Sequence, residues 1–234
     1  MAKTVVVVLF ISCLILSTQA SAQENEVSLS LGATFTPGSH TSVGFLPVAC
    51  PINNPSCGAF VERFHVSTQI SYQGLYARRF LQRPVASLYA ELPVVGVPSR
   101  TLGSTTENLF GPGTNTIRRD FSSVFITPSL RAKFLPDAPI SPFASFGVGV
   151  AHFSSHESGS GFFAVDLPPR FGETVGNNTL AYQFGAGVDF KTPFRHLGFR
   201  LEVRDFVTGR PAFDFAPGNH RNNVFTGGGL VFHF

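Results

Sequence analysis

The sequence predicts an all-β fold, an eight-stranded antiparallel up-and-down transmembrane β-barrel, on three observations. Apolar and polar residues alternate with a period of two in eight segments. Short and long connections follow one another strictly between these segments. One face of each segment is apolar or aromatic, and the other carries small polar residues and glycine, as in strands that separate lipid from a barrel interior.

Length and composition limit the class of protein. The chain has 234 residues, which suits one domain or two small ones. Charged residues make up 13 %, well below the roughly 25 % of ordinary soluble domains, and there are 26 Phe but no Trp. The net charge of +3 is spread along the chain, so the sequence offers no basic patch for nucleic acid.

The first 22 residues have the pattern of a cleaved signal peptide. Lys3 supplies a positive start, Val5 to Leu16 form an apolar run, and Ala20-Ser21-Ala22 has the small-x-small pattern of a cleavage site. The apolar run is shorter than the about 20 residues that a transmembrane helix needs. We therefore expect residues 23–234 to form the mature barrel domain.

The first strand segment shows the alternation clearly. Val27, Leu29 and Leu31 share one face, while Ser28 and Ser30 share the other. Seven further segments repeat this pattern. The predicted strands cover residues 27–36, 63–73, 87–94, 123–134, 145–151, 179–190, 197–204 and 224–234.

The connections support a barrel independently of the strands. Short links are predicted near residues 81–84, 135–141 and 191–196. Long connections rich in Gly, Ser, Asn and Pro occupy about 37–60, 97–120, 154–178 and 207–221. Transmembrane barrels have tight periplasmic turns and long external loops.

The chemistry of the two faces sets their direction. The apolar face is expected to meet lipid, and the face of Ser, Gln, Thr and Gly to fill an eight-stranded interior, which side chains just occupy. A soluble lipocalin-type barrel would need the opposite arrangement. Glycines on the fifth, sixth and eighth strands are expected to make room for longer neighbours inside.

The last strand ends in an aromatic residue, with Leu230, Phe232 and Phe234 on one face. This resembles the C-terminal signature of bacterial outer-membrane barrels, which the barrel-assembly machinery reads in that family. Residues 26–234 as a whole resemble the eight-stranded outer-membrane β-barrel domain family, of which the transmembrane domain of OmpA is a member. The resemblance implies the outer membrane of a Gram-negative bacterium. No periplasmic domain is expected after Phe234, so peptidoglycan anchoring is not implied.

Two cysteines follow the signal peptide, Cys50 and Cys57, in a stretch rich in Pro and Asn. An even pair in an exported protein predicts a disulfide. A metal site is the alternative, but two thiolates without a nearby His are too few ligands. The scattered His residues show no metal spacing, and no cofactor is expected.

Charged residues on the polar faces are predicted to meet in the lumen. One interpretation is a structural ion-pair network that closes the barrel, because buried charges must be paired. The alternative is a narrow gated pore; a wide porin would need some 16 strands. The predicted network consists of Glu91, Arg131, Lys133, Asp189, Arg200, Glu202 and Arg204.

His152 and Ser154 lie two residues apart on the fifth strand and so share a face. They resemble the His-x-Ser pair of outer-membrane lipid A deacylases, and Glu157 or Glu173 could orient the imidazole. The resemblance is two residues long, and we expect no catalysis.

The loops are the predicted place for binding, because loops on a rigid scaffold commonly carry function. In the last long connection Arg210, Phe213, Phe215, His220 and Arg221 could contact lipopolysaccharide phosphates, or could be interfacial anchors. The sequence thus predicts a monomeric barrel with a structural or surface-binding role. A narrow channel and a lipid A-modifying hydrolase are the alternatives.

Overall fold

The computed structural model describes residues 25–37, 40–45, 59–108, 114–156, 175–194, 196–211 and 219–234. Two predictions fall outside these residues: the signal peptide of residues 1–22, and the disulfide between Cys50 and Cys57. Both therefore stay predictions. Among the described residues, none belongs to a helix long and apolar enough to cross a membrane.

All regular structure in the described part of the chain is β-strand. The strand segments are β1 (Asn25–Phe35), β2 (His40–Phe45), β3 (Ala59–Val66), β4 (Gln69–Gln82), β5 (Ala86–Asn108), β6 (Thr114–Ile126), β7 (Ser129–Phe134), β8 (Ile140–His156), β9 (Val175–Lys191), β10 (Leu197–Gly209) and β11 (His220–His233).

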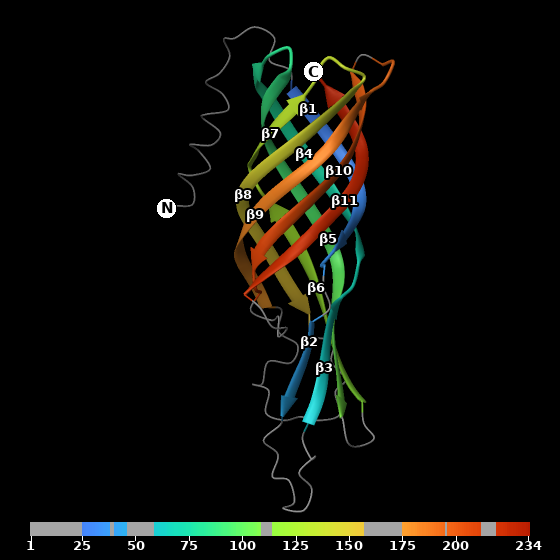
Figure 1. The fold of residues 1–234 in the computed structure, drawn as a ribbon, viewed down its shortest axis with the longest axis vertical. Coiled ribbons are helices and arrows are strands. Elements are labelled where there is room, and N and C mark those ends of the chain that lie inside the picture. The colour runs from blue at the N-terminus through green and yellow to red at the C-terminus, as the bar shows by residue number, and fades with distance from the viewer. Residues whose placement is uncertain are drawn as a thin grey trace, which may run out of the picture.

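These segments form a closed antiparallel ring of eight strands (Figure 1). β3 and β4 pair one after the other with the same side of β5, so together they count as one strand of the ring. β6 and β7 pair in the same way with the other side of β5 and count as a second strand. The ring closes where the first and last strands pair, with Glu26 opposite His233. Closure leaves no free edge within the ring, which is the condition for a sheet to span a bilayer. The predicted eight-stranded up-and-down barrel is confirmed.

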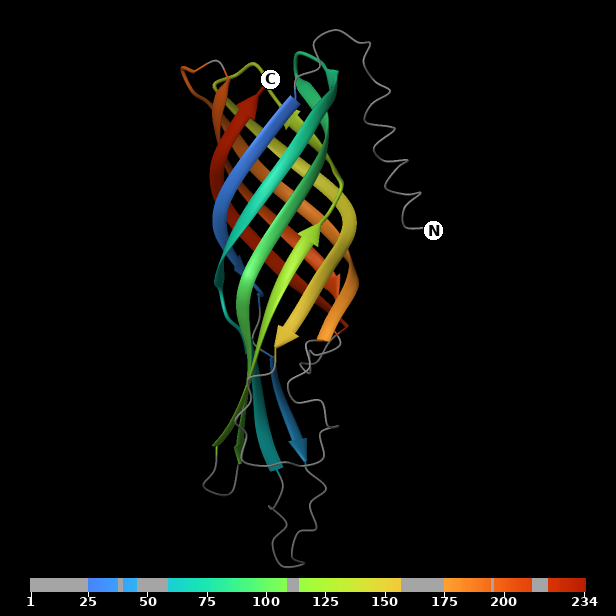
Figure 2. The ribbon, with the colours of Figure 1, turned by 180° about the vertical axis from the view of Figure 1, so that it is seen from behind.

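The two ends of the barrel differ. We call one the turn end: the three short links, residues 83–85, 135–139 and 192–196, lie there, together with Asn25 and Phe234. At the opposite loop end, β2, β3 and the far parts of β5 and β6 extend beyond the ring, as the views from front and back both show (Figures 1 and 2).

One predicted long loop is a strand hairpin instead. β5 continues to Asn108 and β6 begins at Thr114, so residues 97–120 are mostly extended. The ladder runs without further interruption from Arg100 opposite Phe121 to Glu107 opposite Thr114. The Gly, Ser and Asn content suggested a loop, but backbone pairing with interspersed β-branched Thr residues stabilises strands here.

The strand faces point in the predicted directions over most of the ring. Large apolar side chains such as Leu29 (65 % exposed) and Leu130 (60 % exposed) point outward, and Ser28 and Arg131 are fully buried. One assignment was wrong. Continuous alternation over residues 63–73 predicts that Phe64 and Ile70 share the outward face. Phe64 is buried instead, because the strand breaks at residues 67–68 and the alternation resumes in the opposite phase.

The interior is less uniformly polar than predicted. The half of the lumen toward the loop end contains a phenylalanine layer, whose members are all buried: Phe121, Phe125, Phe153, Phe206 and Phe225. Phe125 stacks on Phe206 with ring centroids 4.7 Å apart and meets Phe153 edge-on at 5.9 Å. The lumen therefore has an aromatic half and an ionic half.

Candidate functional site

The ionic half of the lumen is the main concentration of chemical groups in the described structure. All seven charged residues predicted to face one another are buried there, on β5, β7, β9 and β10. The sequence reading missed an eighth, Glu26 of β1, although its position in phase with Ser28 and Ser30 indicated an inward side chain. We call this set the ion layer: Glu26, Glu91, Arg131, Lys133, Asp189, Arg200, Glu202 and Arg204.

Arg200 is central to the ion layer. Its Nε lies 2.6 Å from Oδ1 of Asp189 and its Nη2 lies 2.9 Å from Oδ2, so the pair is bidentate. The same Nη2 donates to Oε2 of Glu26 at 3.2 Å. Bidentate pairs of this kind are among the strongest charge-assisted hydrogen bonds.

Arg131 connects three of the carboxylates. It donates to Glu26 and lies 3.5 Å from Glu91 and 4.0 Å from Asp189. Its guanidinium carbon is 4.5 Å from the ring centre of Tyr89, an aromatic contact that sequence spacing did not reveal. Stacking on a ring helps a desolvated cation, because the ring face carries negative charge density.

Arg204 lies on the side of the ion layer nearer the phenylalanine layer. Its Nη1 is 2.8 Å from Glu91 and its Nε is 2.7 Å from Glu202. The Glu202 carboxylate also accepts hydrogen bonds from Gln73 at 2.5 Å and Ser30 at 3.1 Å. The small polar residues predicted to fill the lumen therefore bind the charged ones.

The ion layer is electrically balanced. Its four carboxylates are matched by four cations, and every member is in at least one ion pair. Such pairing offsets the desolvation of charges that are taken out of water. The arrangement closes the barrel and leaves no excess charge to attract one sign of ion.

Glycines let these side chains fit. A Cβ atom on Gly187 would lie 2.5 Å from the ring of Phe143, which itself packs 4.9 Å from the guanidinium of Arg200. The predicted role of the β9 glycines, making room inside the barrel, is borne out at this position.

Arg100 closes the lumen on the other side of the phenylalanine layer. It is fully buried although its position was predicted to be in a loop. Its Nη2 donates to Thr36 at 2.6 Å and its Nη1 to Asn223 at 2.8 Å, so it connects β1 and β11 with β5. The cavity beside it measures only about 20 Å³. That volume holds about one water molecule.

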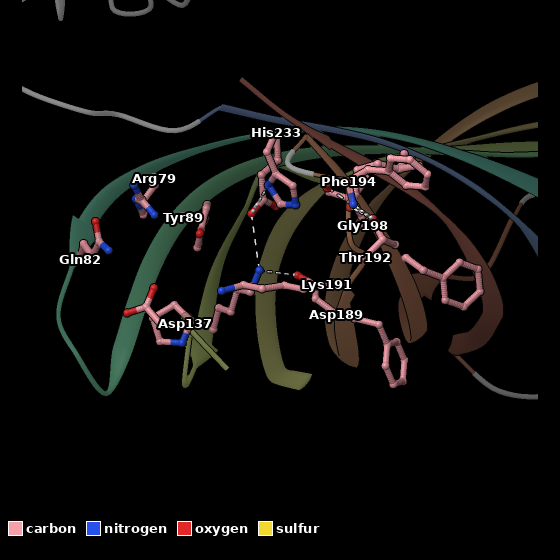
Figure 3. Close-up of a pocket in the computed structure, with 17 residues that line it drawn as sticks. Arg79, Gln82, Tyr89, Asp137, Asp189, Lys191, Thr192, Phe194, Gly198 and His233 are labelled. Carbon is pink, nitrogen blue, oxygen red and sulfur yellow. Dashed lines mark hydrogen bonds and ion pairs between the residues drawn. The ribbon is translucent and has the colours of Figure 1, made fainter. Parts of the chain in front are cut away.

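A wider cavity opens at the turn end. It measures about 410 Å³ and lies on the turn-end side of the ion layer, whose Glu26, Lys133 and Asp189 form part of its lining (Figure 3). We call it the cup. Lys133, Asp189 and His233 line its inner part, and Arg79, Asp137 and Lys191 its outer part. No group of metal-ligating side chains occurs among the described residues, in the cup or elsewhere.

The other predicted sites lie on the outer surface. Leu230, Phe232 and Phe234 point outward near the turn end and are about half exposed or more. At the loop end Arg210 and His220 are exposed and Arg221 is nearly buried, while Phe213 and Phe215 lie outside the described residues.

His152 points outward near the loop end of β8, and Ser154 is partly exposed on the same face. The Nδ1 atom of His152 lies 2.7 Å from Oδ1 of Asn178, a partner that the sequence reading missed. Asn178 is directly opposite His152 in the β8–β9 ladder, which only the register reveals. Glu157 and Glu173 lie outside the described residues.

A closed antiparallel ring of eight strands, apolar outside and ionic within, defines the class of outer-membrane β-barrels. The resemblance predicted from the sequence is thus confirmed at the level of the fold.

Comparisons with known proteins give structural neighbours only. No family model and no curated protein matches the chain. Neisserial surface protein A is 10 % identical, with 90 % of this chain and 97 % of that one covered and a TM-score of 0.43. OprG from Pseudomonas aeruginosa is 11 % identical, with 91 % and 96 % covered and a TM-score of 0.45. Ail of Yersinia pestis, solved with a heparin analogue, is 13 % identical, with 89 % and 99 % covered and a TM-score of 0.40.

Proposed function

We propose that this protein is a monomeric, non-catalytic barrel of the Gram-negative outer membrane, with a structural or surface-binding role. One observation carries the proposal: the lumen is closed twice, by the ion layer and by the phenylalanine layer. A barrel filled in this way is a rigid support, and what it presents to partners lies at its ends.

A diffusion channel fits this interior poorly. A permeating ion would have to break bidentate pairs such as that of Arg200 with Asp189, and then pass the stacked rings of Phe125 and Phe206. Neither step offers water or a compensating charge, and transfer of an ion into an apolar layer is costly.

Surface binding would involve the loop end. β2, β3 and the far parts of β5 and β6 carry backbone well beyond the ring there. The exposed Arg210 provides a cationic group and the exposed His220 a hydrogen-bond donor at the loop end of the ring, both suited to lipopolysaccharide phosphates. At the opposite end, the exposed Phe232 and Phe234 fit recognition by the barrel-assembly machinery during insertion.

Two measurements test the proposal. In the outer-membrane fraction the protein should migrate as a compact form on a cold gel and shift on boiling, as a closed barrel does. In planar bilayers the purified protein should give no stepwise conductance. Regular, ion-selective conductance steps that disappear when the protein is omitted would overturn the sealed-barrel proposal.

A second candidate function is a lipid hydrolase, favoured by the contact of His152 with Asn178. That contact fixes Nδ1, and a Cβ on Gly176 would lie 3.5 Å from Cε1 of the ring, so the imidazole extends toward the residue paired with Ser154. An oriented imidazole beside a serine is the arrangement that activates a nucleophile. Release of acyl chains from lipid A by the wild type, lost in Ser154→Ala, would establish this function; equal, background release by both would remove it.

A further inference from the structure

The cup at the turn end is bounded by side chains on several sides, as a small-molecule binding pocket is. Figure 3 shows Arg79, Gln82 and Asp137 on one side, Thr192 and Phe194 on the other, and Asp189, Lys191 and His233 between them. These side chains come from three different strands, β4, β9 and β11, and from two turns of the barrel. The volume of about 410 Å³ lies within the range of small-molecule sites.

The carboxylates of Asp189 and Glu26 on the floor of the cup are paired with guanidinium groups of the ion layer that do not line the cup. Arg200 binds Asp189 through two nitrogen atoms, at 2.6 and 2.9 Å, and also reaches Glu26 at 3.2 Å. Arg131 binds Glu26 as well. Neither guanidinium lines the cup, so these acids present little uncompensated negative charge to a ligand.

Lys133 is the cation that faces the cup from the floor. Its Nζ lies 2.9 Å from Asp189 and 3.8 Å from Glu26, so only the first contact is within hydrogen-bond distance. An ammonium has three donors. Donors of Lys133 are therefore left for a further acceptor in the cup.

The rim adds positive charge and apolar surface. Among the described residues that line the rim are Arg79, Lys191 and one carboxylate, that of Asp137. Phe194 is 70 % exposed and Leu197 lies beside it on the wall. A ligand would thus meet cations at the floor and rim, and an apolar wall on one side.

We propose that the cup binds a small organic anion, with a phosphate or carboxylate group between Lys133 and Lys191 and its apolar part against Phe194. The proposal does not rest on the sealed-barrel proposal, because the cup opens at the turn end and shares with the ion layer only its floor residues Glu26, Lys133 and Asp189. Two sources share this chemistry: a soluble phosphorylated or carboxylated metabolite, and the headgroup of an anionic phospholipid at the barrel rim.

Titration of the refolded protein in a neutral detergent tests the site, with phenyl phosphate as the probe and calorimetry as the readout. Wild type should bind phenyl phosphate more tightly than inorganic phosphate, because only the former has an apolar part. Lys191→Ala should weaken binding about five-fold, the effect of removing one partly exposed charge contact. Arg83→Ala, which removes an exposed cation at the turn end that does not line the cup, is the matched control and should bind as wild type does.

The proposal fails if phenyl phosphate does not bind, if Lys191→Ala and Arg83→Ala have equal affinities, or if phenethylammonium competes as well as the anion. Cold-gel mobility of each variant shows that it is folded. Native mass spectrometry from nanodiscs of mixed phosphatidylcholine and phosphatidylglycerol separates the two sources. Retained phosphatidylglycerol that phenyl phosphate displaces supports the headgroup, and binding of phenyl phosphate without retained lipid supports a soluble anion.

Discussion

The two halves of the lumen fill similar space by opposite means. Toward the turn end, the ion layer packs eight charged side chains that form ion pairs with one another; toward the loop end, the phenylalanine layer packs five aromatic rings. Along β10 the change takes one step, from the inward Arg204 to the inward Phe206. A closed eight-stranded ring therefore demands a full interior but does not prescribe its polarity.

The two halves should differ in their tolerance of change. Paired charges stabilise little in total, yet removing one partner leaves the other buried and unpaired. Aromatic packing fails more gradually, since the loss scales with the volume removed. The following predictions compare the halves, and because the chain has no Trp, the folded fraction on cold gels across a urea series is a suitable measure.

The largest effect is expected for Arg200→Met. It leaves Asp189 without its bidentate partner and takes one cation from Glu26. We expect a loss of about 3–5 kcal/mol in the free energy of unfolding. The double variant Arg200→Met/Asp189→Leu should recover part of this loss, because it removes both members of the pair. Equal stability of Arg200→Met and wild type would show that the ion layer is not the desolvated network described.

Phe206→Ala should destabilise somewhat less, by about 3 kcal/mol, because it leaves a cavity beside Phe125 without creating an unpaired charge. Planar-bilayer conductance of this variant should stay absent, since the ion layer still closes the lumen. Conductance in Phe206→Ala would mean that the phenylalanine layer alone is the seal.

Gly187→Ala and Gly74→Ala form a matched pair, one inside and one outside the barrel. A Cβ on Gly187 would lie 2.4 Å from the backbone oxygen of Leu201 and 2.5 Å from the ring of Phe143, whereas the nearest atom to a Cβ on Gly74 is Leu29 Cδ2 at 4.0 Å. Overpacking should cost Gly187→Ala about 1–3 kcal/mol, and Gly74→Ala should be within about 0.5 kcal/mol of wild type. The urea midpoints of the two variants measure this difference in stability. A lower midpoint for Gly74→Ala than for Gly187→Ala would contradict the inward assignment of Gly187.

The smallest effect concerns the pair Cys50 and Cys57. If they form the predicted disulfide, the intact mass of the non-reduced protein is lower by two hydrogens, and alkylation labels them only after reduction. Reductant should leave the boiling-dependent gel shift in place, since the ring closes through backbone pairing of β1 and β11. Alkylation of both cysteines without reductant would refute the disulfide.

Most of the ring could be predicted because period-two alternation is a local signal. The inward position of Arg131 or Arg200 follows from its neighbours along one strand. Where the alternation changes phase, as between Phe64 and Ile70, local reasoning placed a residue on the wrong face. It also read Gly- and Ser-rich strands as loops over residues 97–120, because composition does not show which backbone groups find partners.

The contacts between strands could not be predicted in this way. Asn178 meets His152, and Glu26 meets Arg131 and Arg200, across ladders and across the lumen, and those meetings depend on register and closure. Glu26 was detectable in principle from its phase with Ser28, but its partners were not. Pairings of this kind arise only when the ring closes.

Three features follow from neighbouring residues along the chain: the alternation within each strand, the number of eight strands, and the separation of apolar faces from polar faces. The division of the lumen into ionic and aromatic halves, and the cup at the turn end, became apparent only in the folded structure. The physical reason is that volume and charge balance in the lumen are properties of side chains brought together from all eight strands at once.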